Sequence, residues 1–178
     1  MGICIALSYL LGTFDIFKLP YGGGVSLESL PLMLYSYLSG PVYGFISGFV
    51  YGVLMITKPS LFIHPVQFLL DYPLAFSSFF IIGFLGENKS KGMEERHPLQ
   101  IIFSLKLSLF CFFSFVLRFC FHCVSGLLFL SLFIKEMPDN IFSYVFIYNL
   151  SYLLPTALFC TIVFGFIAPR FKNILKGP

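Results

Sequence analysis

The sequence predicts an all-α, polytopic membrane protein with six transmembrane helices and both termini in the cytoplasm. Of its 178 residues, 58% are hydrophobic and only 11% are charged, and the mean hydropathy is +0.92. Soluble domains carry about 25% charged residues, so this chain lacks the polar side chains to cover a water-facing surface. Several apolar runs also reach the roughly 20 residues that a bilayer span needs. We therefore expect one membrane-embedded domain, residues 1–178, in the plasma or inner membrane.

Six apolar segments supply the predicted helices. In chain order they run from about Gly2 to Phe17, Ser26 to Leu38, Val42 to Thr57, Pro65 to Leu85, Leu99 to Phe133 and Ile141 to Ile167. The first is followed by the Pro/Gly-rich stretch Leu19–Gly24, where irregular backbone is expected. The fifth exceeds one upright span, so we expect a long or tilted helix whose Lys106 reaches the interface. Pro169 is expected to end the sixth.

Two residue types inside these segments predict packing and not chemistry. Glycine recurs at every fourth position of the third segment, at Gly44, Gly48 and Gly52. Such a stripe lets helices approach closely in lipid. The five cysteines lie in apolar segments and are odd in number, which favours small apolar packers over a disulfide framework or a zinc site. No cofactor is expected.

Basic residues set the predicted orientation. With the N-terminus inside, the inner segments hold Lys89, Lys91, Arg96, Arg170, Lys172 and Lys176, whereas the outer segments hold Lys18, Lys58 and Lys135. This excess predicts cytoplasmic termini and a cytoplasmic loop over the polar stretch Glu87–His97. The basic tail is then a topology signal, so no nucleic-acid partner is expected.

Polar side chains inside a membrane segment are costly and usually face a cavity or one another. Four clusters stand out, and the first contains Asp71. On a helix, His64, Gln67 and Asp71 share one face, because their spacing is i, i+3 and i+7. A carboxylate there can hold a cation or an amino group. Pairing of Asp71 with Arg118 or Lys106 as a structural contact is an equal alternative.

The second cluster is Arg118, His122, Ser125 and Gly126, which continue one stripe of a helix. Its glycine leaves room beside a polar face. A lone histidine in such a helix is more often a packed, hydrogen-bonded residue. With arginine one turn away, we favour a functional site.

The third cluster places Tyr144, Tyr148 and Tyr152 on one helix face, with Asn149 beside them. Asn149 lies about 140° from Tyr144 on an ideal helix, so both can reach one ligand only if the helix begins irregularly near Tyr144. An aromatic girdle at the membrane interface explains Tyr144 well and Asn149 poorly.

The fourth cluster combines Gly22–Gly24 with Ser26 and Glu28. It is compatible with a plain loop that has a capping serine, and equally with a lid over a pocket. No nucleophile–base pair, metal-ligand spacing or phosphate loop accompanies the four clusters. The four clusters therefore favour the binding of a small polar molecule that is cationic or aromatic.

Together, the clusters resemble the thiamine-specific substrate-binding subunits (S components) of energy-coupling-factor transporters, the ThiT/YuaJ family. The similar stretches are Pro20–Leu27 through Pro31, His64–Phe76 (HPVQFLLDYPLAF), the R-x-x-x-H-x-x-S-G run Arg118–Gly126, the Y-x-x-x-Y-N-x-x-Y-x-x-P run Tyr144–Pro155, and Ala168–Arg170. They occur in the family's order and extend from about Leu19 to Arg170. Four coincident motifs are far more specific than any one of them.

The resemblance implies a six-helix fold and a thiamine pocket near the outer face, closed by the first loop. Carried over by position, the ligand-binding residues are Asp71, Tyr72, His122, Gly126, Tyr144 and Asn149. Lid or secondary contacts are expected from Tyr21, Gly22, His64, Gln67 and Arg118. Thiamine has a permanent thiazolium cation and an aminopyrimidine, so a carboxylate and aromatic faces suit it.

The sequence departs from the family in one respect that bears on the ligand. Some members stack thiamine between tryptophans, and this chain has none. The matching positions are Gly22 and Leu130, and Tyr21, Phe129 or Phe133 are the aromatic substitutes nearby.

The leading hypothesis is a binding and translocation subunit that is not an enzyme. It would work with a transmembrane coupling subunit and two ATP-binding subunits, because the chain has no Walker motif of its own. A solitary thiamine carrier, or an S component for another vitamin, is the alternative within transport. An intramembrane enzyme using Asp71, Arg118 and His122 is the alternative outside it.

The predicted orientation is testable by cysteine labelling. A cysteine introduced at Ser90, inside the polar stretch Glu87–His97, should resist a membrane-impermeant reagent added outside intact cells. Efficient labelling from outside would contradict both the orientation and the count of six spans.

Overall fold

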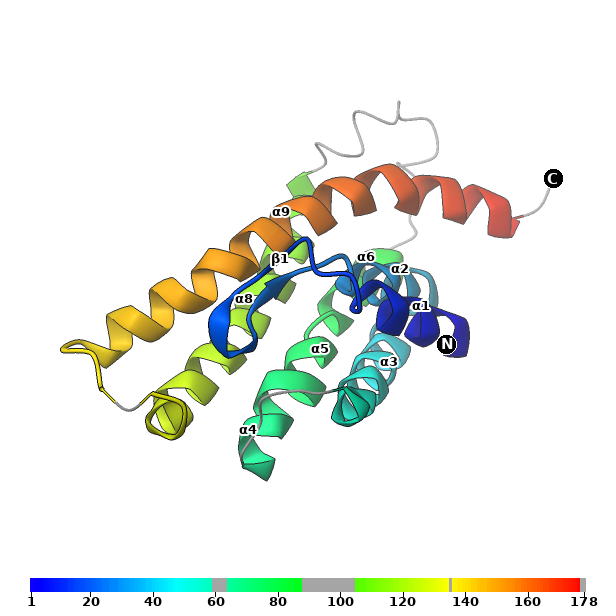
Figure 1. The fold of residues 1–178 in the computed structure, drawn as a ribbon. Coiled ribbons are helices and arrows are strands. Elements are labelled where there is room, and N and C mark those ends of the chain that lie inside the picture. Colours follow the sequence, from blue (N-terminus) through cyan, green and yellow to red (C-terminus); the bar gives the residue numbers. More distant parts are fainter. Residues whose placement is uncertain (59–63, 88–104, 135, 177–178) are drawn as a thin grey trace.

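The structure, a computed structural model, describes residues 1–58, 64–87, 105–134 and 136–176. This part of the chain consists of helices packed side by side and one short β-hairpin (Figure 1). Within the described ranges, three segments are long and apolar enough to cross a membrane: Pro65–Gly86, Leu105–Leu132 and Ile141–Ala168, with mean hydropathies of 1.8, 1.9 and 2.0. Shorter apolar helices accompany them. The predicted all-α, polytopic membrane fold is confirmed.

The N-terminal half is built around a hairpin that lies between its first two helices. Its elements are α1 (Gly2–Leu11), β1 (Phe17–Lys18), the 3-10 turn η1 (Pro20–Gly22), β2 (Gly24–Val25), α2 (Ser29–Ser39), α3 (Pro41–Leu54) and the 3-10 turn η2 (Met55–Thr57). β1 and β2 pair antiparallel, and the Ile16 N–H donates to the Val25 carbonyl at 2.8 Å. The expectation that the first helix reaches Phe17 is wrong, because Gly12 ends it and the residues that follow enter the hairpin.

The C-terminal half holds the three long segments. Its elements are α4 (Pro65–Leu69), the π-helical turn η3 (Leu70–Leu74), α5 (Ala75–Ser77), α6 (Phe80–Glu87), α8 (Leu105–Phe129), the 3-10 turn η4 (Leu130–Leu132) and α9 (Ile141–Lys176). The expectation that Pro169 ends the last helix is wrong. A proline removes only one backbone hydrogen bond, and long apolar helices tolerate that loss. Residues 88–97 of the predicted polar loop, and residues 99–104 of the fifth segment, lie outside the described residues.

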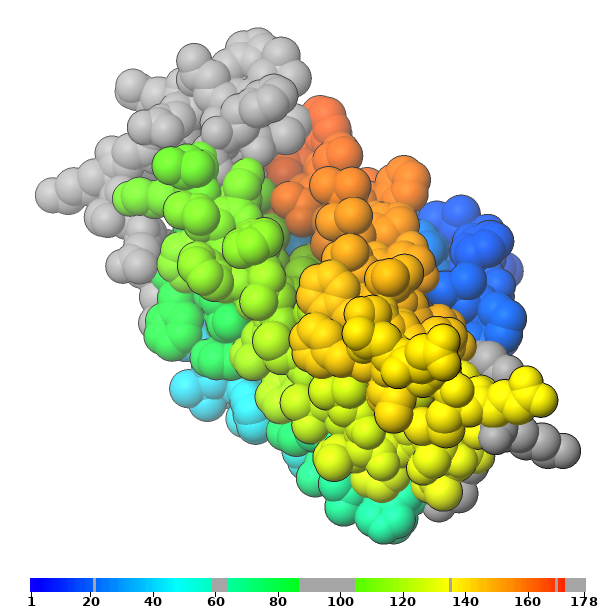
Figure 2. Space-filling view, turned by 90° about the vertical axis from the view of Figure 1, so that its left-hand side faces the viewer, coloured from blue at the N-terminus to red at the C-terminus, as the bar shows by residue number. Residues whose placement is uncertain are grey.

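The core and the outer surface of the bundle are both apolar. Tyr51, Phe76 and Phe79 are completely buried where α3, α5 and α8 meet. Figure 2 shows α8 and α9 side by side across one face of the molecule. Phe112 of α8 is 60% exposed and Ile147 of α9 is 65% exposed. Apolar side chains this exposed on two neighbouring helices are what a lipid environment covers.

The N-terminus and the last turns of α9 are both on the right in Figure 1, whereas α9 begins on the left. The placement of both termini in the cytoplasm stays a prediction.

Glycines of α3 bring this helix into contact with the backbone of the segment that carries Asp71. A Cβ on Gly48 would collide with the Phe76 carbonyl and lie 2.8 Å from Ser77 Cα. A Cβ on Gly52 would collide with the backbone of Pro73. The prediction that the stripe is a packing surface is confirmed.

This contact predicts the effect of a single added methyl group. Gly48→Ala should lower the free energy of unfolding by about 1–3 kcal/mol, because the neighbouring backbone has no room to give way. The matched control is Gly2→Ala, since a Cβ on Gly2 has nothing within 4 Å. Thermal unfolding of both variants in detergent provides the measurement. Equal melting temperatures would contradict the backbone contact.

Candidate functional site

A cavity of about 480 Å³ lies between the hairpin, η3, α8 and α9. Pockets for small ligands typically measure about 300–1,000 Å³. The predicted residues that line it are Asp71, Tyr72, His122, Gly126, Tyr144 and Asn149, together with Gly22, Gln67 and Arg118. Residues from three of the six predicted segments and the first loop thus meet in one place. The side chain of Tyr21 lies outside the described residues.

Asp71 reaches the cavity from a distorted part of its helix. Leu70–Leu74 form a π-helical turn with Pro73 inside it, and π-turns of this kind are frequent at functional sites. One Asp71 oxygen lies 3.1 Å from His122 Nδ1. The other accepts hydrogen bonds from the Ser125 hydroxyl at 2.8 Å and from the Gln67 amide at 3.4 Å. These contacts of the carboxylate thus come from an imidazole, a hydroxyl and an amide.

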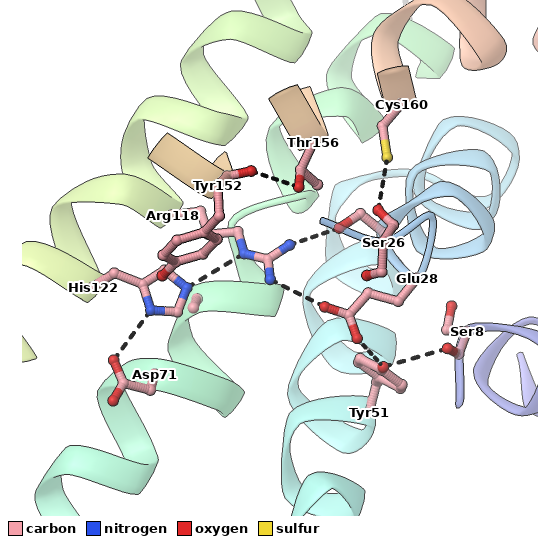
Figure 3. A network of polar contacts seen from close by, with 12 residues as sticks. Ser8, Ser26, Glu28, Tyr51, Asp71, Arg118, His122, Tyr152, Thr156 and Cys160 are labelled. Atoms are coloured by element: carbon pink, nitrogen blue, oxygen red, sulfur yellow. Dashed lines mark hydrogen bonds and ion pairs between the residues drawn. The ribbon is translucent and has the colours of Figure 1, made fainter. Parts of the chain in front are cut away.

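Arg118 is buried near Asp71, but its ion pair is with Glu28 (Figure 3). Its Nη2 lies 3.3 Å from Glu28 Oε1, and its Nη1 donates to the Ser29 hydroxyl at 2.6 Å. The guanidinium also lies 4.2 Å from the centre of the Phe76 ring, which adds a cation–π contact. Pairing of Asp71 with Arg118, the structural alternative for Asp71, is therefore wrong, because Glu28 takes that position.

Lys106, the other partner considered for Asp71, is exposed near the start of α8. Asp71 meets α8 at His122 and Ser125, four and five turns further along that helix by about 3.6 residues per turn. Pairing of Asp71 with Lys106 is therefore wrong as well.

Glu28 links the cavity to residues that sequence reasoning did not assign to a site. Its second oxygen accepts a hydrogen bond from the Tyr51 hydroxyl at 2.8 Å. Asp15, Lys18 and Lys58 also line this end of the cavity. The sequence signal that could have identified Glu28 as an ion-pair partner was Arg118, because a cation inside a membrane segment requires an anion nearby.

The hairpin covers the cavity and is held by a tyrosine of α9. The Tyr148 hydroxyl accepts a hydrogen bond from the Gly23 N–H at 3.1 Å and donates to the Pro20 carbonyl. Gly22 has a φ of +100°, a conformation that side chains disfavour. Of the two alternatives for this loop, the serine cap is wrong: α2 begins at Ser29, and its N-cap residue is Glu28 with no side-chain cap bond.

The tyrosines of α9 form the predicted face. The rings of Tyr144 and Tyr148 are stacked with centroids 6.3 Å apart, and Tyr148 contacts Tyr152 edge-on at 5.8 Å. The irregular helix start near Tyr144, which was the condition for Tyr144 and Asn149 to reach one ligand from an ideal helix, is not found, since α9 is helical from Ile141 onward. Tyr144 and Asn149 both line the cavity because it extends around this side of the helix.

His64 is the predicted contact that does not line the cavity. It precedes Pro65, and a residue before proline favours extended backbone, so His64 has φ −128° and ψ 137° and caps α4. Its Nδ1 accepts a hydrogen bond from the Val66 N–H at 3.2 Å. The proposed shared face of His64, Gln67 and Asp71 is therefore wrong at His64. Its ring instead stacks on Phe129, with centroids 5.0 Å apart.

Two cysteines of α8 flank His122 in the sequence. Cys120 and Cys123 have C-x-x-C spacing, but both are free, and Cys120 is exposed on the outer surface of the helix. Neither lines the cavity.

Gly126 lies where α8 packs against α9 as well as beside the cavity. A Cβ at this position would lie 2.7 Å from Val145 Cγ1. Val145 is 3% exposed, and its branched side chain has little rotamer freedom in a helix. The absence of a side chain at Gly126 therefore serves helix packing.

Comparison with known proteins agrees with this arrangement. Residues 1–176 match the sequence model of a family described as thiamine transporter protein (Thia_YuaJ). The chain is 30% identical over 175 residues to the thiamine transporter ThiT of Bacillus subtilis (strain 168). The aligned region covers 97% of this chain and 88% of that protein. This chain also shares the fold of a solved structure of ThiT from Listeria monocytogenes, with a TM-score of 0.73, 18% identity, and coverage of 96% of this chain and 92% of that chain.

The contact at Gly126 predicts a reversal of sign in a double-variant test. Gly126→Ala should lower the melting temperature, because the new methyl group overlaps Val145 Cγ1. In the Val145→Ala background the overlap is gone, and the same change should raise the melting temperature, because alanine is the better helix former by about 1 kcal/mol. Thermal unfolding of the four proteins checks this. The same sign in both backgrounds would contradict the packing role.

Proposed function

Since the chain belongs to the thiamine transporter protein family, we propose that it is the membrane-embedded substrate-binding subunit for thiamine uptake and that the cavity beside Asp71 is its thiamine site. The family and the apolar helices make it a multi-pass protein of the cell membrane. As a transporter subunit it binds and translocates thiamine, and we propose that it catalyses no reaction.

The proposal rests on the contacts of the Asp71 carboxylate, which leave part of its hydrogen-bonding capacity free for a ligand. Its contacts come from His122, Ser125 and Gln67, while the nearby Arg118 is neutralised by Glu28. The side chain is 20% exposed and lines the cavity. A carboxylate can accept about four hydrogen bonds, so it retains capacity for a donor on a ligand. The amino group of the pyrimidine and the thiazolium charge of thiamine both suit it.

Aromatic rings supply the second requirement of a flat, cationic ligand. Tyr72, Tyr144 and Tyr148 line the cavity, with Phe129 and Phe133 beside Leu130. Their faces attract a cation and stack on flat rings. We propose that these rings replace the tryptophans that the sequence lacks.

The remaining contacts follow from the hydrogen-bonding capacity that each side chain has left. Asn149 donates to the Val145 carbonyl at 2.9 Å and accepts from the Tyr152 hydroxyl at 2.8 Å. An amide has two donors and two lone pairs, so one of each remains for a ligand. We propose that Tyr144 and Asn149 bind one end of thiamine, that Tyr72, Asp71 and His122 bind the other polar groups, and that Gly126 gives clearance.

The sequence has no Walker motif, so we propose that the energy for uptake comes from partner subunits. We propose that the chain works with a transmembrane coupling subunit and two ATP-binding subunits, with its termini in the cytoplasm. The resemblance of its motifs to energy-coupling-factor S components supports this assembly.

Substitution of Asp71 tests the site. Asp71→Asn should weaken thiamine binding by about one to two decades, the equivalent of the roughly 1.5–3 kcal/mol of a charge-assisted hydrogen bond. The fold should persist, because asparagine is isosteric. Titration of the purified protein with thiamine gives the affinity, and its melting temperature reports the fold.

Asp15→Asn is the matched control. Asp15 lines the same cavity, but its carboxylate lies 4.0 Å from Lys18 Nζ at the hairpin end, so its loss should leave the affinity close to that of the wild type. Wild-type affinity in Asp71→Asn would remove Asp71 from the site. Failure of the unaltered protein to bind thiamine would refute the function itself.

A further inference from the structure

We propose that Arg118 is a positioning residue that fixes His122 as the neutral imidazole protonated on Nδ1. This inference rests on the proposed thiamine site, because its consequence is that Asp71 keeps its negative charge for the ligand. It adds a role for a residue that does not itself need to touch thiamine.

The hydrogen-bond directions carry the first step. Arg118 Nε lies 3.5 Å from His122 Nε2, with its N–H directed at that nitrogen. An arginine nitrogen is always a donor, so His122 Nε2 must offer a lone pair. The proton of a neutral imidazole then sits on Nδ1, which lies 3.1 Å from Asp71 Oδ1. His122 therefore donates to the carboxylate.

The second step is that Arg118 cannot turn away. Ser29 and Glu28 hold its two terminal nitrogens, at 2.6 Å and 3.3 Å, and Phe76 stacks on the guanidinium. The side chain is 6% exposed. With both ends of a planar group held, the direction of the Nε–H bond is fixed as well. Figure 3 shows the resulting row from Glu28 through Arg118 and His122 to Asp71.

The third step concerns charge. An imidazolium would carry a proton on Nε2, facing the N–H of a guanidinium, and two cationic donors would then meet without an acceptor. It would also form an ion pair with Asp71 that cancels the carboxylate charge. The ring of Tyr152 on α9 also contacts the imidazole edge-on, with centroids 6.1 Å apart. The neutral tautomer avoids both effects.

The ¹⁵N NMR spectrum of the imidazole reports the tautomer directly. The full-length protein, labelled with ¹⁵N-histidine, is measured in detergent at pH 7 without thiamine. The chain has three histidines, and the His122 signals are assigned by their loss in His122→Asn. We expect a protonated Nδ1 and an unprotonated Nε2. A protonated Nε2 in the wild type would overturn the proposal, whatever the variants show.

Two variants distinguish which neighbour sets the tautomer. In Asp71→Asn, the side-chain amide can donate or accept, so Arg118 alone should preserve the Nδ1–H form. In the double variant Glu28→Gln/Arg118→Gln both buried charges are removed together, so no unpaired ion remains to unfold the protein. There we expect a mixture of tautomers. Loss of the Nδ1–H form in Asp71→Asn and its retention in the double variant would show that Asp71, and not Arg118, sets the tautomer.

The affinity for thiamine tests the consequence. The double variant should bind thiamine about five- to tenfold more weakly, the equivalent of one ordered hydrogen bond. A mixture of tautomers with unchanged affinity would overturn the link to the ligand. The NMR result is obtained without thiamine, so a failure of the proposed function and a failure of the proposed role of Arg118 are distinguishable.

Discussion

The arrangement of this protein depends on a buried cation, the guanidinium of Arg118, and on its neutralisation by Glu28. A charge inside a membrane protein costs several kcal/mol unless it is paired and hydrogen-bonded. Here the anion comes from the segment that joins the hairpin to α2, and the cation from α8. The pair therefore ties the N-terminal half of the chain to the C-terminal half beside the cavity. It also leaves the Asp71 carboxylate in contact with His122, Ser125 and Gln67 and not with the guanidinium, which suits a cationic ligand.

Much of this fold follows from the order of apolar and polar residues. Hydropathy located every described helix, since a bilayer span requires a long apolar run. It misplaced the end of α1 because residues after Gly12 form strand pairs with residues further along, which local hydropathy does not reveal. Resemblance of four motifs gave the residues around the cavity, and nine of the eleven residues predicted as ligand, lid or secondary contacts line it.

The contacts between those residues could not be read from spacing. From spacing, a structural pair of Asp71 with Arg118 or Lys106 was as favoured as a ligand-binding role, because helical periodicity gives the face of a residue within one helix and not the register between two helices. The structure pairs Arg118 with Glu28 and Asp71 with His122. The two members of each pair are separated in the chain by more than one helix. His64 was misassigned for a local reason, the extended backbone that Pro65 imposes.

The glycine stripe of α3 has a mechanical consequence. Where Gly48 and Gly52 meet Phe76 and Pro73, backbone faces backbone with no layer of side chains between them. Such a contact cannot slide by small steps, because each shift drives carbonyl groups into the opposite chain. α3 and η3 therefore behave as one rigid body that carries Asp71. The hairpin Phe17–Val25 also borders the cavity, and it is linked to α9 through the hydrogen bonds of the Tyr148 hydroxyl, which constrain it less than a backbone-to-backbone contact would.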